Sequence, residues 1–182
     1  MSKKNELTDF IYAALFAAVI GVMGLIAIPL PISPVPITGQ SLAIMLAGSI
    51  LTVRQAAFSV LTFLLIGAIG VPVFAGGTAG IGIIAGPRGG YLIGFLAGAT
   101  IISLLKGQTN SVLRLVLANI TGGIGMIYIF GVLWLDFVTG MGLQKAIMVG
   151  VLPYIPGDIL KVIAATFIGA AVNRYRAKTG AL

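Results

Sequence analysis

An aspartate and a lysine interrupt the most C-terminal apolar stretch of the sequence. Asp158 and Lys161 lie in segment 151–178, which is largely apolar until its basic end. The two residues are three positions apart, so on a helix they share one face. A charge inside a bilayer is costly unless it is paired or faces a wet cavity, and such residues commonly mark functional sites. This pair is therefore the leading candidate for a binding site.

The alternative interpretation of the pair is a structural ion bridge whose charges only cancel each other. Such a bridge is a costly way to fill a membrane helix, because both groups lose their hydration. As a binding site, the lysine suits a carboxylate, and the aspartate suits an amide or ureido N–H. Apolar surroundings suit an apolar ring or chain. The residues predict a small, mostly apolar ligand that carries a carboxylate and hydrogen-bonding groups.

The composition indicates an integral membrane protein. Of the 182 residues, 59% are hydrophobic and 8% are charged, whereas soluble domains are roughly 25% charged. The mean hydropathy is +1.15. At ~20 residues per span, the chain has room for about six helices. The apolar runs are continuous rather than alternating, which disfavours a membrane barrel.

Missing residue types exclude several kinds of chemistry. The chain has no cysteine and no histidine, so disulfides, thiolate nucleophiles, haem and most zinc or copper sites are excluded. Its four acidic residues leave little for an oxygen-ligand metal site. No metal, cofactor or catalytic residue is therefore expected. The net charge of +7 fits basic cytoplasmic loops and membrane lipid rather than nucleic acid.

The apolar runs predict an all-α domain spanning 1–182 with both termini in the cytoplasm. The six expected helices cover about 10–28, 39–53, 56–70, 90–105, 113–135 and 151–178. A turn with Arg54 and Gln55 separates the second and third helices. A polar loop at 106–114 and a short loop at 136–145 are also expected.

Two connecting segments are unusually apolar for loops. Segment 29–40 carries four prolines, which forbid a regular helix, and we expect it to fold back over the protein as a lid. Segment 71–92 is rich in glycine. It lacks the Gly-Lys-Ser or Gly-Lys-Thr of a phosphate-binding loop, so we expect it to line the site.

The distribution of basic residues predicts the orientation, because cytoplasmic loops carry an excess of lysine and arginine. Eight basic residues fall on the inner side, namely Lys3, Lys4, Arg54, Lys106, Arg114, Arg174, Arg176 and Lys178. Arg88 and Lys145 fall on the outer side, and Lys161 lies within the membrane. Both unusual loops and the proline-broken start of the last helix then lie outside, which predicts one outward-facing site lined by these loops.

Further residues are weaker candidates for this site. They are Arg88, Gln40, Tyr91, Asn119 and Tyr154. Each has a plain alternative: the arginine as an interface charge contacting lipid phosphate, the amides as staples between helices, and the tyrosines as interfacial aromatics.

A stripe of small residues runs along the first helix. Its alanines recur at spacings of three and four, which lets another helix approach closely. They are Ala13, Ala14, Ala17 and Ala18. The stripe taken alone favours packing within the protein itself.

Three motifs, in this order and spacing, resemble the biotin-transporter (BioY) family over nearly the whole chain. They are PVPITGQSLAIMLAG, GVPVFAGGTAGIGIIAGPRGGYLIGF and LPYIPGDILK. Members of this family are the substrate-binding (S) components of energy-coupling-factor (ECF) transporters. The resemblance implies a six-helix protein of the bacterial cell membrane that is not an enzyme and captures biotin with high affinity from outside.

The resemblance also implies partners and roles. ATP would be hydrolysed by two cytoplasmic ATPases that act through a transmembrane coupling protein. The alanine stripe would be the face that docks this coupling protein. Asp158 and Lys161 would be the main biotin contacts, with a cation on the carboxylate and Asp158 on a ureido N–H. Arg88 lies in the second motif and Gln40 in the first. The alternative is a self-sufficient, ion-coupled carrier, although inverted repeats are not evident.

Overall fold

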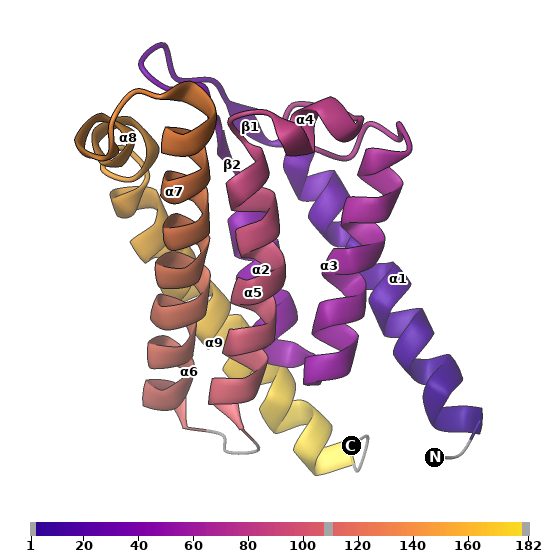
Figure 1. The fold of residues 1–182 in the computed structure, drawn as a ribbon. Coiled ribbons are helices and arrows are strands. Elements are labelled where there is room, and N and C mark those ends of the chain that lie inside the picture. Colours follow the sequence, from indigo (N-terminus) through magenta and orange to yellow (C-terminus); the bar gives the residue numbers. More distant parts are fainter. Residues whose placement is uncertain (1–2, 108–110, 180–182) are drawn as a thin grey trace.

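The computed structural model describes residues 3–107 and 111–179, and side chains from 6 onward in the first range and up to 178 in the second. Long helices run side by side and form one bundle (Figure 1). They are α1 (Lys3–Leu25), α2 (Gln40–Ile50), α3 (Val53–Ala68), α5 (Gly89–Lys106) and α9 (Ile155–Thr179), with a further rod made of α6 (Val112–Ala118), η1 (Asn119–Met126) and α7 (Ile127–Thr139). The predicted all-α class is confirmed.

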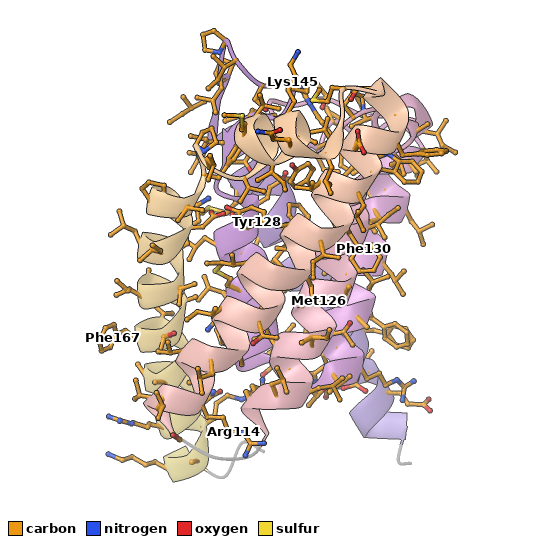
Figure 2. All side chains as sticks on the ribbon, turned by 60° about the vertical axis from the view of Figure 1, so that its left-hand side comes forward. Arg114, Met126, Tyr128, Phe130, Lys145 and Phe167 are labelled. Atoms are coloured by element: carbon orange, nitrogen blue, oxygen red, sulfur yellow. The ribbon has the colours of Figure 1, made fainter. Side chains whose placement is uncertain are left out.

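Four of these helical segments are long and apolar enough to cross a membrane. They cover Glu6–Leu25, Gly89–Lys106, Val112–Thr139 and Ile155–Lys178. Exposed apolar side chains such as Phe167 point away from the bundle, as a lipid-facing surface requires (Figure 2). Helix α2, with 11 residues, is only ~16 Å long and α3 about 24 Å, against a hydrocarbon core of ~30 Å.

The two ends of the bundle differ. The start of α1 and the end of α9 lie at one end, while α4 (Ile81–Ala85), α8 (Leu143–Gly150) and a short hairpin cover the other (Figure 1). The hairpin pairs β1 (Ala27–Ile28) with β2 (Ile37–Thr38) in antiparallel register. Two basic residues that support the predicted orientation, Lys3 and Lys4, have side chains outside the described part. Segment 108–110 of the expected polar loop lies wholly outside it.

The start of α3 corrects the predicted turn. Thr52 Oγ1 accepts a hydrogen bond from Gln55 N, and Gln55 Oε1 accepts one from Thr52 N, at 3.3 and 3.1 Å. This reciprocal cap satisfies two backbone donors at the helix start. Arg54 and Gln55 therefore lie in the first turn of α3 and not in the loop that precedes it.

The prediction of a loop at 136–145 is also wrong in part. Helix α7 continues to Thr139 and ends where Gly140 adopts a left-handed conformation, with φ of 62°. The Asp136 carboxylate accepts a hydrogen bond from Gly142 N at 2.8 Å, just before α8 begins. The short helix α8 lies across the end of the bundle (Figure 1). The turn that contains Pro153 separates it from α9.

The long helix at 112–139 contains the π-helical segment η1, which the sequence analysis did not predict. Two of its glycines allow close packing. A Cβ at Gly122 would lie 2.6 Å from Gly98 O of α5, and one at Gly123 would lie 2.6 Å from Met45 Cγ of α2. The η1 segment therefore packs closely against both neighbouring helices.

The proline-rich segment 29–40 and the glycine-rich segment 71–92 are both anchored in the core. Phe74, from the glycine-rich segment, packs edge-to-face on Phe63 of α3 with ring centroids 5.4 Å apart. Val35, from the proline-rich segment, is 9% exposed and belongs to the same apolar cluster. These two segments thus form the roof of the bundle, as expected for a lid and a site-lining loop.

Candidate ligand-binding site

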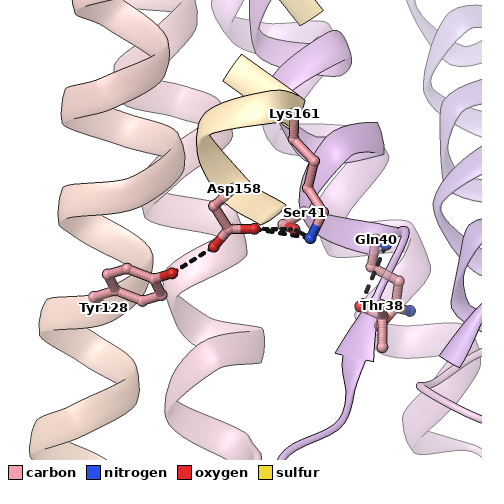
Figure 3. Close-up of polar contacts among 6 residues, drawn as sticks. All are labelled: Thr38, Gln40, Ser41, Tyr128, Asp158 and Lys161. Atoms are coloured by element: carbon pink, nitrogen blue, oxygen red, sulfur yellow. Dashed lines mark hydrogen bonds and ion pairs between the residues drawn. The ribbon is translucent and has the colours of Figure 1, made fainter. Parts of the chain in front are cut away.

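Four polar side chains meet beneath the roof of the bundle (Figure 3). Lys161 Nζ lies 2.8 Å from Asp158 Oδ1 and donates to Ser41 Oγ at 2.8 Å. Ser41 Oγ in turn donates to Asp158 Oδ1 at 3.4 Å. Tyr128 donates its hydroxyl to the other carboxylate oxygen, Oδ2, at 2.5 Å. We call these four residues the outer polar cluster.

Three helices position the outer polar cluster. Ser41 lies in the first turn of α2, Tyr128 near the start of α7, and the ion pair in the first two turns of α9. Asp158 N also donates to Tyr154 O at 2.9 Å, which begins the hydrogen bonding of α9. Asp158 is only 5% exposed. The cluster is therefore a tertiary junction that forms only when all three helices are packed.

The ammonium of Lys161 has one N–H donor that its described partners do not use. An ammonium group has three N–H donors, and the described partners, Ser41 and Asp158, take two of them. The side chain retains 17% of its exposure and lines a pocket. The third donor is available to an acceptor atom of a ligand in that pocket.

Two pockets with empty volumes of about 390 and 330 Å³ adjoin each other at this end. The first is lined by the outer polar cluster together with Ile127 and Tyr154, and the second by Gln40, Phe74, Ala75, Ile83, Arg88 and Leu92. Five residues line both, namely Val35, Pro36, Thr38, Tyr91 and Phe95. The lining combines aromatic and aliphatic surface with a few polar groups, as is typical of small-molecule sites.

Arg88 and Gln40 line the second pocket and also connect loops. Arg88 Nε donates to Pro34 O at 3.2 Å, and its Nη1 donates to Ala75 O at 3.5 Å. Arg88 thereby bridges the two roof segments. Gln40 Nε2 donates to Val73 O at 3.1 Å, which ties the start of α2 to the glycine-rich segment.

Both candidate tyrosines line the pockets but use their hydroxyl groups on the protein itself. Tyr91 donates to Gly150 O at 2.8 Å. The Tyr154 hydroxyl lies 2.8 Å from Ser33 Oγ and 2.5 Å from Val35 O. Burial raises the pKa of Tyr154 above its ordinary value, although the bond to Ser33 opposes the rise. The Tyr154 hydroxyl therefore ties the proline-rich segment to the turn just before α9.

The structure places Asn119 away from both pockets. It is fully buried at the start of η1, and its Nδ2 donates to Ser49 Oγ and Leu115 O, both at 3.0 Å. A longer bond of 3.4 Å reaches Thr166 of α9. These contacts join three helices, so the geometry matches the staple role and not the ligand contact also considered for this residue.

The alanine stripe of α1 divides between two faces. Ala13 and Ala17 are 3% and 5% exposed and pack inside the bundle, whereas Ala14 and Ala18 are exposed. One position along a helix turns a side chain by ~100°, which separates the two pairs. Of these four alanines, only the second pair is open to another protein in this conformation, and the docking role expected of the stripe stays a prediction.

Two residues of the outer polar cluster, Ser41 and Tyr128, were not predicted from the sequence. Ser41 directly follows Gln40 in the first motif, and Tyr128 stands in the middle of an apolar run. A phenol far from either end of a membrane helix needs a hydrogen-bond partner, and that signal was available. Within 3–107 and 111–179, no group of three or more histidine, cysteine or acidic residues lies together.

Comparison with known proteins identifies the family. Residues 1–178 match the model of the BioY family. The biotin transporter BioY of Rhizobium etli is 43% identical over 90% of this chain and 92% of its own. The biotin transporter BioY2 of Lactococcus lactis subsp. cremoris is 38% identical over 97% and 96%.

A solved structure agrees with these relatives. The S-component for biotin from an ECF-type ABC transporter superposes with a TM-score of 0.88 at 30% identity, covering 96% of this chain and 95% of that chain. The relatives are transporters and not enzymes, and the apolar helices make this protein a membrane protein. The chain belongs to the BioY family.

Proposed function

We propose that this protein is the biotin-binding subunit of a vitamin uptake transporter. One observation carries the proposal: Lys161, oriented by Asp158 and Ser41, has a donor left over and lines an aromatic pocket. The names of the relatives supply biotin as the ligand. Biotin combines an apolar bicyclic ring and chain with a ureido group and a carboxylate, which is the chemistry expected from the residues.

The pocket chemistry suggests how biotin is held. Phe95 and Tyr91 offer ring faces to the apolar body of the ligand, since both line the two adjoining pockets. The free donor of Lys161 suits an acceptor oxygen, from either the carboxylate or the ureido carbonyl. Asp158 already accepts bonds on both oxygens. We therefore assign it chiefly to orienting Lys161, in place of the direct ureido contact expected from sequence.

We also propose how the protein crosses the membrane and which end of the bundle faces outward. Helices α2 and α3 are shorter than the hydrocarbon core, but they pack against the longer segments, so we count them with those four as six membrane helices of one domain in a bacterial plasma membrane. Arg114 lies at the end of the bundle where α1 begins and α9 ends, opposite Lys145 (Figures 1 and 2), and the last turn of α9 carries Arg176 and Lys178. The positive-inside rule then places the termini in the cytoplasm and the pockets at the outer face.

Release into the cell requires an energy source outside this chain. The sequence has no phosphate-binding loop, so ATP hydrolysis is assigned to two partner ATPases and a transmembrane coupling protein of an ECF module. Ala14 and Ala18 form the exposed small-residue surface that suits helix docking. A self-sufficient carrier is the alternative. Uptake that requires active ATPases in reconstituted vesicles supports the first assignment, and uptake without them supports the second.

Calorimetric titration of the purified protein with biotin tests the proposal. We expect saturable one-site binding by the wild type. Binding should be lost or strongly weakened in Lys161→Met, with folding checked by thermal unfolding. A folded wild-type protein that does not bind biotin would refute the substrate assignment. Tight binding by both proteins would keep the substrate and remove Lys161 from the site.

A further inference from the structure

We propose that Tyr128 is a positioning residue, which aims Lys161 at the ligand by holding the Asp158 carboxylate in place. This inference rests on the proposed function, because the ligand is taken to be biotin. The Tyr128 hydroxyl donates to Asp158 Oδ2 at 2.5 Å, while Oδ1 of the same carboxylate faces Lys161 Nζ at 2.8 Å. The two carboxylate oxygens thus have separate tasks.

Rotation of the carboxylate explains why the tyrosine matters. The terminal torsion of an aspartate is broad, so the side chain by itself does not fix the direction of its oxygens. Bonds to Tyr128 on Oδ2 and to Ser41 on Oδ1 hold the group from two sides. Without the phenol, the carboxylate can turn, and the free donor of Lys161 no longer keeps one direction.

The π-helical segment η1 explains the direction in which the Tyr128 side chain points. Tyr128 is two residues beyond the end of η1. A π-helical segment has wider turns than an α-helix, so it changes the angular position of every side chain after it. Gly122 and Gly123 allow this segment to lie against α5 and α2. The unusual helix thereby turns the phenol inward, toward α9 (Figure 3).

Tyr91 provides a matched comparison. It lines the same pocket as Tyr128 and is the more buried of the two, with 7% exposure against a partly buried Tyr128. Its hydroxyl binds the backbone Gly150 O instead of the ion pair. Removing the hydroxyl from either residue deletes one oxygen and the hydrogen bond that it donates within the protein. The two variants differ in whether the lost bond leads to Lys161.

A double-mutant cycle separates positioning from general structural support. Tyr128→Phe is expected to weaken biotin binding by about 10-fold, as for loss of a bond to a charged group. In a Lys161→Met background the same change should weaken binding less than about 2-fold, because the residue acts through Lys161. Any loss caused by Tyr91→Phe should be equal in both backgrounds. Equal losses from Tyr128→Phe in both backgrounds, or none in either, would overturn the proposal.

Infrared spectroscopy provides a readout that does not need a ligand. The chain has four acidic residues, so isotope labelling of the aspartate carboxyl groups gives few carboxylate bands. The band that disappears in Asp158→Asn is the band of Asp158. Tyr128→Phe should shift this band, and Tyr91→Phe should leave it in place. An unshifted band in Tyr128→Phe would contradict the inference even if biotin binds. A shifted band in a protein that does not bind biotin would instead count against the proposed function.

Discussion

Each end of helix α2 meets a cluster of polar side chains, and the two clusters differ in whether they border a pocket. At its start, Ser41 joins the outer polar cluster on α9. At its end, Ser49 bonds to Asn119, and α5 and α9 donate to the last carbonyls. Both clusters link α2 to α9, yet the pockets described above lie only beside the first.

At the end of α2, side chains of α5 and α9 donate hydrogen bonds to the last carbonyl groups, and we call this set the inner cluster: Ser49, Ser103, Lys106, Asn119, Asn173 and Arg176. Asn173 donates to Ser49 O at 2.9 Å, and Arg176 donates to Ile50 O at 3.1 Å. Ser103 donates to Leu51 O at 2.7 Å, and Lys106 donates to the same oxygen. A short helix that ends within the protein leaves carbonyl groups that need donors, and cations there also favour the helix dipole.

This difference shows why a buried charge or amide does not by itself identify a site. Lys106 of α5 and Lys161 of α9 contact opposite ends of helix α2. The first binds a carbonyl that requires a donor, whereas the second is held by a serine and an aspartate and borders a pocket. Spare hydrogen-bonding capacity beside a cavity is what distinguishes the ligand site from the structural cluster.

The largest expected effect is at the outer cluster. Lys161→Met should weaken biotin binding by about 100-fold or more, because a charge-assisted bond to the ligand is lost and Asp158 is left without its cation. Calorimetry measures the affinity, and thermal unfolding checks the fold. A change smaller than about 3-fold would mean that the pair is structural, like the inner cluster.

Asn119→Leu should lower the stability of the protein and leave its biotin affinity nearly unchanged, in contrast to Lys161→Met. The substitution removes the bonds to Ser49 and Thr166 and leaves these hydroxyl groups buried. We expect about 2 kcal/mol of lost stability, which corresponds to a fall of roughly 4–8 °C in Tm for a chain of this size. Biotin affinity should stay within about 3-fold of the wild type, as for a change remote from the site. A selective loss of affinity at unchanged Tm would place Asn119 in ligand binding after all.

Arg88→Met tests the roof of the outer pockets. Loss of the bonds to Pro34 O and Ala75 O separates the two roof segments. Biotin should dissociate about 5-fold faster, since each bond to a charged donor contributes on the order of 1 kcal/mol or more. Dissociation is followed by a chase of bound labelled biotin with excess unlabelled biotin. An unchanged dissociation rate with slower association would assign Arg88 to ligand entry and not to closure.

Ser103→Ala should have the smallest effect. Its hydroxyl donates to Leu51 O, which also accepts from Lys106, so the carbonyl keeps a partner after the substitution. The expected cost is about 1 kcal/mol of stability, measured by thermal unfolding. Affinity for biotin should not change. A loss of binding here would show that the inner end of α2 influences the outer site.

Sequence patterns predicted the parts of the site that break a pattern. Asp158 and Lys161 are conspicuous charges in an apolar run, and the proline- and glycine-rich segments are conspicuous as loops. Tyr128 escaped prediction because its aim depends on the π-helical turn before it, which results from tertiary packing. Asn119 was ambiguous for a similar reason, since a buried amide serves a ligand or a neighbouring helix equally well until the cavity is located.

Helix boundaries show the same limit. The reciprocal cap of Thr52 and Gln55 was a local signal that places the start of α3 correctly. Helix α8 was hidden because its eight residues are too few to produce a distinct apolar run beside α9. The two strands of the hairpin, each of two residues, depend on the pairing of Ala27 with Thr38 and of Ile28 with Ile37. Local signals therefore locate long helices, whereas the short elements that shape the pockets require the folded protein.

The most direct test measures the distance between Lys161 and bound biotin. Solid-state NMR on protein with ¹⁵N-labelled lysine side chains, with biotin ¹³C-labelled in turn at the carboxyl and ureido carbons, reports this contact. One of the two carbons should lie within about 4 Å of a lysine nitrogen, as a direct hydrogen bond requires. The signal should be absent in Lys161→Met loaded with excess biotin. Bound biotin with neither carbon near a lysine nitrogen would contradict the assignment of the outer polar cluster as the ligand site.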